Sequence, residues 1–340
     1  MKEIARRDAL QAVAGLASVV AVGTVAGQLS SAPSTPALDT VPATADAVMN
    51  ANVDALHRDD GLRTLVTAAL QQRAQYVSAD SSAEQPRNVD ALLSDVEAEF
   101  ETSPESVHHA TVFGDVGGDG DDLFDGYAGV VLQAELSAED VKSGIENVDD
   151  IDFSELDESG TVVYKPESDG APWVGALGSG RVAVGTEGAV YDAVEVTNGE
   201  AAALGGPLRD AYTDTREGPV RFASRLPEPT ENEAVPAGVG GDDGQSIDVT
   251  PLDDVRTLAG TVYRNGDVRG LETTLSAADT AAARDVASLV RELRDRAASE
   301  LRDTEVADVV GGLSVDRDGA TVTASVSRTV DELESLVDGL

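Results

Sequence analysis

The dominant feature of this sequence is its excess of negative charge. It contains 63 aspartate and glutamate residues against 24 lysine and arginine residues, a formal net charge of −39. Self-repulsion of this size destabilises any compact state, but at about 1 M salt the Debye length falls to about 3 Å and most of the repulsion is screened. Lysine is confined to Lys2, Lys142 and Lys165. The composition is typical of a halophile's solvated surface and is less consistent with an acidic face made for one cationic partner.

The same composition excludes several classes of function. A surface that binds nucleic acid needs clustered lysine and arginine, so no nucleic-acid partner is expected. The chain contains no cysteine, which excludes disulfides, thiol catalysis and zinc–cysteine sites. Its stability must therefore come from core packing, and the roughly 300 residues after the leader are enough for two domains.

The N-terminus has the pattern of an export signal. Arg6 and Arg7 form a twin arginine, Leu10 follows, and 12–27 is an uncharged run of mostly alanine, valine and glycine. This order of a positive segment, an apolar segment and a polar exit predicts a signal or leader over 1–27. The apolar run is shorter than the roughly 20 residues of a membrane span. We therefore expect an extracellular or cell-surface protein, either released or tethered to the membrane by an uncleaved leader.

Residues 28–42 are rich in serine and proline and predict a polar tether. Beyond it we predict an α+β fold with antiparallel sheets and helices packed on one face, in two domains, 43–217 and 218–340. The apolar spacing predicts helices over 61–76, 88–100, 138–146, 187–196, 207–212, 277–301 and 329–337. It predicts strands over 47–56, 107–113, 127–136, 161–165, 172–177, 181–185, 255–263, 268–275, 309–316 and 320–327. Residues 149–159 are predicted as a linker, and 264–267 as an Asn-Gly hairpin turn.

The order of these elements suggests an internal duplication. A strand–strand–helix–strand–strand–helix unit is predicted over 107–197 and again over 255–340. The two copies share a Leu-Ser-Ala step from strand to helix, at 136–138 and 275–277. Serine at this step also serves as a helix cap, which would produce the same match without any duplication.

One loop has a composition that suits calcium. Residues 114–126 are rich in glycine and acid, and carboxylate oxygens are the ligands that calcium prefers. Its candidate ligands are Asp115, Asp119, Asp121, Asp122 and Asp125. The spacing differs from that of an EF-hand loop, and a solvated hairpin loop would have the same composition. Calcium is the single candidate cofactor.

No catalytic group stands out. His108 and His109 are adjacent, and neighbours on a strand point to opposite faces, so one metal ion is not expected to bind both. The run 175–180 is rich in glycine but lacks the Lys-Ser/Thr of a phosphate loop, and predicts a β-turn. No G-x-S-x-G motif is present. The 63 acids supply many carboxylate pairs, so no pair is distinguished as glycosidase-like.

Three segments carry a resemblance to a known group of proteins. The segments 6–10 (RRDAL), 41–46 (VPATAD) and 178–186 (GSGRVAVGT) are similar to those of exported proteins of halophilic archaea. The resemblance implies export and a high-salt environment but no activity. We therefore expect a non-catalytic exported or surface-tethered protein with a binding or envelope role. The alternatives are a secreted hydrolase that uses carboxylates and a calcium-dependent adhesion or scaffold module.

Overall fold

The computed structural model describes most of the chain after the predicted tether. The described residues are 38–63, 106–115, 126–146, 152–168, 171–226, 238–240, 246–302 and 306–333. The chain divides into two compact units with the boundary between Arg209 and Asp210. We call the described residues up to 209 the N-terminal unit and those from 210 the C-terminal unit.

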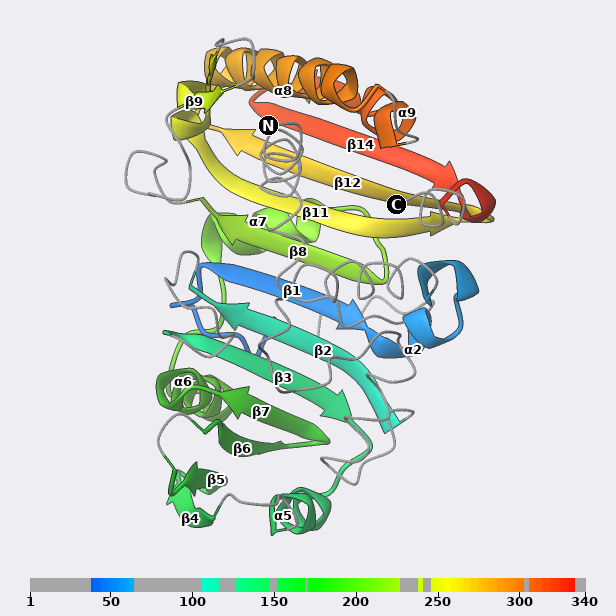
Figure 1. Cartoon of the computed structure of the whole chain (residues 1–340). Coiled ribbons are helices and arrows are strands. Elements are labelled where there is room, and N and C mark those ends of the chain that lie inside the picture. Colours follow the sequence, from blue (N-terminus) through cyan, green and yellow to red (C-terminus); the bar gives the residue numbers. More distant parts are fainter. Residues whose placement is uncertain are drawn as a thin grey trace. The chain divides into compact units, whose positions relative to one another are not determined.

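The N-terminal unit contains an antiparallel sheet whose order is β1-β2-β3-β7-β6-β5-β4. Its strands are β1 (Ala47–Asn52), β2 (Val107–Gly114), β3 (Ala128–Ala134), β4 (Phe153–Glu158), β5 (Thr161–Pro166), β6 (Trp173–Gly178) and β7 (Arg181–Gly185). Most neighbouring strands follow one another in the sequence, whereas β1 and β2 are separated by residues 53–106. The longer connection between β3 and β7 contains a helix and the hairpin β4–β5 (Figure 1).

The helices of this unit are α2 (Val53–His57), α5 (Ala138–Glu146), α6 (Glu187–Asn198) and the start of α7 (Gly206–Asp214). Val141 of α5 packs with Tyr164, Val174 and Val182 on one face of the sheet. Helix α6 lies on the opposite face, because a Cβ built on Gly175 would be 3.1 Å from a methyl of Val190. The two helices therefore cover opposite faces, where the sequence predicted one covered face.

The long strands of the C-terminal unit also pair antiparallel, in the order β8-β11-β12-β14-β13. Its strands are β8 (Val220–Arg225), β11 (Val255–Asn265), β12 (Val268–Ala277), β13 (Ser314–Asp318) and β14 (Thr321–Thr329), beside a small hairpin of β9 (Gly238–Gly240) and β10 (Ser246–Asp248). Helix α8 (Thr280–Glu300) runs across β11, β12, β14 and β13, and α9 (Val306–Gly311) follows it (Figure 1). A 3-10 turn, Thr250–Asp254, precedes β11.

The α+β class and the antiparallel sheets are confirmed. The two units also share a strand order when β4 and β5 are set aside: β1-β2-β3-β7-β6 corresponds to β8-β11-β12-β14-β13. In both units the third strand leads into a helix, α5 or α8, before the chain returns to the sheet. This order is what a duplication would produce, and the duplication stays a prediction.

Several predicted elements need correction. The predicted strand 47–56 ends at Asn52, because the Asn52 side chain accepts a hydrogen bond from the amide of Ala55 and caps α2. The predicted linker 149–159 contains β4, an acidic strand paired with β5. The predicted strand 309–316 is the end of α9 followed by β13. Strand β8 was not predicted.

Some predicted elements lie outside the described residues, either wholly or in large part. These are the leader, most of the tether, the helices over 61–76 and 88–100, and the end of the helix over 329–337. The last of these begins inside the described part, where Thr329 and Glu332 form a reciprocal cap. Among the described helices, none has the length and hydropathy that a membrane span requires.

Candidate functional site

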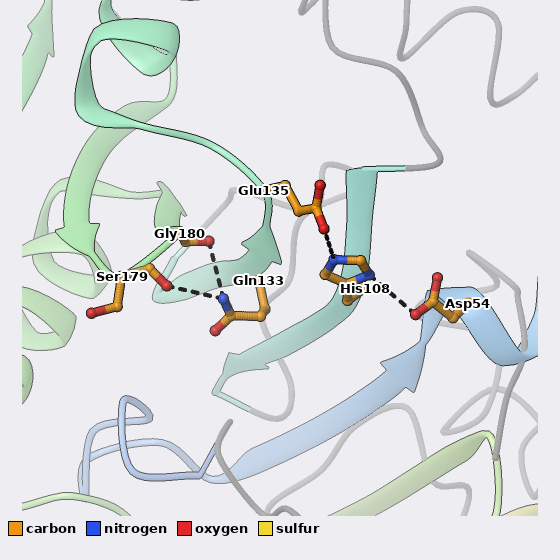
Figure 2. A network of polar contacts seen from close by, with 6 residues as sticks. All are labelled: Asp54, His108, Gln133, Glu135, Ser179 and Gly180. Atoms are coloured by element: carbon orange, nitrogen blue, oxygen red, sulfur yellow. Dashed lines mark hydrogen bonds and ion pairs between the residues drawn. The ribbon is translucent and has the colours of Figure 1, made fainter. Parts of the chain in front are cut away.

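One group of polar contacts in the N-terminal unit surrounds His108. Its Nδ1 is 3.1 Å from Oδ2 of Asp54, and its Nε2 is 3.5 Å from Oε1 of Glu135. Figure 2 shows the imidazole between the two carboxylates, which come from the first turn of α2 and from the residue after β3. The contact to Glu135 is the weaker one, since that side chain is 77% exposed and solvent screens the charge.

A β-bulge explains the position of His108. Val107 pairs with Ala134 and His109 pairs with Gln133, so His108 is an extra residue between them in β2. A bulge of this kind bends the strand and redirects a side chain. The neighbouring strand ends at Asn52, opposite His109, and its turn into α2 brings Asp54 to the same end of the sheet. The contact therefore depends on pairing that no local sequence pattern displays.

The two histidines have different environments. Burial lowers the pKa of His109 below its ordinary value; the negative charge of Asp54 opposes this shift and His108 adds to it. Only an imidazolium can donate to both carboxylates beside His108, because the neutral ring has a single N–H. Both described partners of the His108 ring are carboxylates, so it lacks the hydroxyl that a nucleophile–base pair needs. In the described part of the chain, no three acidic or histidine residues are arranged to hold a metal ion.

The glycine-rich run 175–180 forms a tight hairpin between β6 and β7, as predicted. Ser179 and Gly180 occupy its two-residue loop with φ of 54° and 73°, the combination of a type I′ turn. The side-chain amide of Gln133 donates to the carbonyls of Ser179 and Gly180, at 3.1 and 3.4 Å (Figure 2). A Cβ at position 180 would also clash with the carbonyl of Ala134. The backbone conformation of the hairpin therefore explains these glycines. A phosphate-binding role for their amides is not needed to explain the motif.

Of the predicted calcium ligands, only Asp115 lies within the described residues. Its amide donates to the carbonyl of Tyr127 at 3.0 Å, which closes the base of the acidic loop. Burial raises the pKa of Asp115, and the nearby charge of Asp46 raises it further. Asp119, Asp121, Asp122 and Asp125 lie outside the described residues, as do the signal residues Arg6 and Arg7. The calcium site stays a prediction.

A second polar cluster surrounds Tyr127, whose carbonyl accepts the hydrogen bond from the amide of Asp115. The hydroxyl of Tyr127 donates to Oδ2 of Asp192 at 2.7 Å, and the hydroxyl of Thr44 donates to the same oxygen at 3.0 Å. Burial is the largest cause of a strongly raised Tyr127 pKa, so the phenol stays protonated. The cluster joins α6 to the start of the unit and to the end of the acidic loop. Its members are 148 and 65 residues from Asp192, so sequence spacing could not have indicated it.

The N-terminal sheet also has an apolar face that is incompletely buried. Cross-strand pairing aligns Met49, Val112, Val130 and Val184 in one row, and Ala110 and Leu132 in the next row on that face. All six side chains are half-buried, whereas residues of the opposite face such as Val131 and Ala183 are almost fully buried. We call these six residues the apolar strip. It continues the face on which α5 packs, and a contiguous apolar surface that is only partly covered can serve as an interaction site.

Comparison with known proteins identifies no family. No protein-family model matches the chain, and no curated protein matches it. Crystal form III of TP0453 is similar with a TM-score of 0.48 and 10% identity, over 91% of this chain and 100% of that one. Crystal form IV gives 0.46 and 10%, over 88% and 95%, and crystal form I gives 0.44 and 7%, over 90% and 97%. Similarity at this level supports no conclusion about activity, ligand or partner.

Proposed function

We propose that this chain is a non-catalytic, exported or surface-tethered protein of an extreme halophile that binds an envelope or extracellular partner. The observation that carries the proposal is the apolar strip. Leaving half-buried valine, leucine and methionine side chains on a sheet face forfeits free energy, at about 25 cal/mol for each Å² of apolar surface left in water. A partner that covers the strip would recover that free energy.

The polar clusters support binding better than hydrolysis. A carboxylate hydrolase needs two acids in unlike environments that face a common substrate. The acids of the two polar clusters instead hold structure together: Asp54 pairs with His108, and Asp192 accepts two hydroxyls. Their contacts join secondary-structure elements of the N-terminal unit, which is the expected role of a scaffold for a binding face.

Export depends on the twin arginine in this proposal. Arg6→Lys/Arg7→Lys should keep the chain inside the cell, because the Arg-Arg pair is read as an address rather than as positive charge. Cell fractionation with intact-mass measurement tests this, with a Lys2→Arg variant as the matched control. Wild type and control should be found outside or in the envelope, and the double variant inside. Export of the double variant at the wild-type level would contradict a twin-arginine signal.

Binding through the strip has a direct test. Washed envelopes of the source cells are mixed with the full chain at molar salt and sedimented. Val112→Thr/Val130→Thr replaces two neighbouring strip valines by an isosteric polar residue and should reduce the bound fraction about tenfold, equivalent to about 1.4 kcal/mol of binding free energy. Any contribution of the leader is the same in both proteins and does not affect the comparison.

The control for this measurement comes from the C-terminal unit. Val262 and Val326 are also half-buried strand valines, so Val262→Thr/Val326→Thr makes the same chemical change elsewhere. It should bind as wild type does. Equal loss in both double variants, or no loss in either, would show that the strip is not the binding surface.

A further inference from the structure

We propose that Arg291 and Arg294 of α8 block the open edge of β13 and so prevent a second copy of this chain from adding a strand there. The inference is independent of the apolar strip. It rests on the place of β13 in the sheet, on the backbone groups that face outward from it, and on the contacts of the two arginine side chains.

Strand β13 lies at the edge of its sheet. It is the terminal strand in the order β13-β14-β12-β11-β8 and, among the described strands, pairs with β14 alone. An edge strand presents unpaired backbone N–H and C=O groups, to which a strand of another chain can bond. Such pairing produces dimers or aggregates unless the edge is blocked.

The register of the β13–β14 hairpin shows which backbone groups face outward. Asp318 pairs with Thr321 across a two-residue loop, so these two residues exchange hydrogen bonds. Hydrogen-bonded and non-hydrogen-bonded pairs alternate along an antiparallel ladder. The N–H and C=O groups of Val315 and Arg317 therefore point away from β14. By the same alternation, the carbonyl of Leu313 lies at the start of this outward row.

Two of these outward carbonyls are occupied by side chains of α8. Nη2 of Arg291 donates to the carbonyl of Val315 at 2.9 Å. Nη1 of Arg294 donates to the carbonyl of Leu313 at 3.1 Å. Oδ1 of Asp295 accepts a hydrogen bond from Nε of Arg294 at 2.8 Å, which helps to hold that guanidinium in place. A strand that approached β13 would have to displace both arginine side chains.

High salt explains why hydrogen-bonding side chains are needed at this edge. Many edge strands are protected by charge, because like-charged strands repel each other. At about 1 M salt the Debye length is about 3 Å, so the net charge of −39 does little to keep two copies of this chain apart. Strand β13 itself carries Asp316, Arg317 and Asp318, whose mixed signs add little repulsion. A side chain bound to the carbonyl blocks the edge without relying on unscreened charge.

The sequence of β13 would allow it to pair with itself. In an antiparallel pair centred on Val315, that residue would face the same residue of the second copy, and Ser314 would face Asp316. No acid would then lie opposite another acid, an arrangement that costs stability. The amide of Arg317 would donate to the carbonyl of Leu313 in the other copy. This pairing needs both carbonyls that the arginines now occupy.

The test is sedimentation velocity of the full chain at molar salt over a series of concentrations. Arg291→Ala/Arg294→Ala removes both guanidinium groups and keeps a high helix propensity. Its dissociation constant for dimer formation should be about tenfold lower than that of wild type, or lower still. The matched control is Arg284→Ala/Arg296→Ala, which removes the same charge from the same helix; Arg296 pairs with Glu300 along α8. The control should associate as wild type does.

A proline in β13 separates strand pairing from other causes of association. Because the amide of Arg317 points away from β14, Arg317→Pro keeps the existing ladder and removes a donor that an added strand would need. The triple variant Arg291→Ala/Arg294→Ala/Arg317→Pro should return to the association of wild type. Association caused by partial unfolding would not be reversed in this way, so the comparison holds even if the double variant is less stable.

Three results would each overturn the inference. The first is an Arg291→Ala/Arg294→Ala protein that sediments as wild type does. The second is equal association of the Arg284→Ala/Arg296→Ala control, because loss of positive charge would then be the cause. The third is association that persists with Arg317→Pro. None of these results bears on the proposed function, since none of the substituted residues belongs to the apolar strip.

Discussion

Dilution of the folded chain from molar salt to below about 0.5 M should unfold or loosen it, because screening is lost while the net charge of −39 remains. The ion pairs of the described residues do little to oppose this. Lys142–Glu155 is about half exposed on both sides, and such surface pairs contribute about 0–1 kcal/mol each. The acidic strand β4 has Glu155, Asp157 and Glu158 within four residues, so its pairing with β5 should be among the first contacts to weaken.

The measurement is circular dichroism and fluorescence along a salt dilution series. Trp173 is the single tryptophan and is 9% exposed, with the ring of Tyr191 5.4 Å away, so its emission reports on the N-terminal unit alone. Emission should shift to the red as the near-UV dichroism disappears. Returning the diluted sample to molar salt is the control, and it should restore both signals. A cooperative near-UV spectrum that persists at about 50 mM salt would contradict the repulsion argument.

Sequence reasoning was most accurate where local chemistry decides the structure. Helix α5 has the predicted bounds, Ala138–Glu146, because Ser137 and Asp140 cap each other through hydrogen bonds within four residues. The hairpin after β11 is present as well, with Gly266 at the first loop position and a φ of 60°. These features depend on neighbours in the sequence, so one segment is enough to predict them.

The errors arise where pairing between strands overrides a local signal. Ser276 was predicted to cap α8, but β12 continues to Ala277 because it pairs with β11 and β14. The cap is Asp279, whose Oδ1 accepts hydrogen bonds from the amides of Ala281 and Ala282. Strand β4 was predicted as a linker because its sequence is acidic and gives no sign that it pairs with β5. An edge strand tolerates such charge, which also discourages association with other strands.

The candidate site was largely beyond prediction for the same reason. Asp54 and His108 are 54 residues apart, and the bulge at His108 exists only in the paired sheet. Glu135 is one of 63 acids and carries no distinguishing neighbour in the sequence. The apolar strip was partly predictable, since the run of Val130, Val131 and Leu132 predicts a buried strand. Only the register shows that Val130 and Leu132 share the incompletely buried face while Val131 does not.

In three cross-strand pairs an aromatic ring lies over a glycine. Phe113 pairs with Gly129 in the N-terminal unit, and Phe222 with Gly260 and Tyr263 with Gly270 in the C-terminal unit. Phe113 and Tyr263 both come from the second strand of their sheets, and Gly129 and Gly270 from the third. In these pairs the ring occupies the space that a side chain on the glycine would need.

Gly129→Ala should therefore destabilise the N-terminal unit. A Cβ at position 129 would be 2.5 Å from Cζ of Phe113, and that ring is only 2% exposed and has no free space to move into. Overpacking of this kind costs about 1–3 kcal/mol of the free energy of unfolding. Gly270→Ala should behave similarly, because its Cβ would meet the ring of Tyr263 and is 2.5 Å from the hydroxyl oxygen. Thermal unfolding at molar salt should show a drop of about 2–4 °C for each kcal/mol.

The general effect of replacing glycine by alanine within a helix or strand is the opposite, since it lowers the conformational entropy of the unfolded chain. Gly188→Ala in α6 measures that effect in the same unit: its Cβ would be 3.7 Å from the Tyr127 ring, an ordinary contact, and should stabilise by about 0.5–1 kcal/mol. Phe113→Leu/Gly129→Ala should cost less than the sum of its single changes, because the smaller side chain leaves room for the methyl group. Strict additivity, or a Gly129→Ala protein as stable as wild type, would mean that the ring is not confined against the glycine.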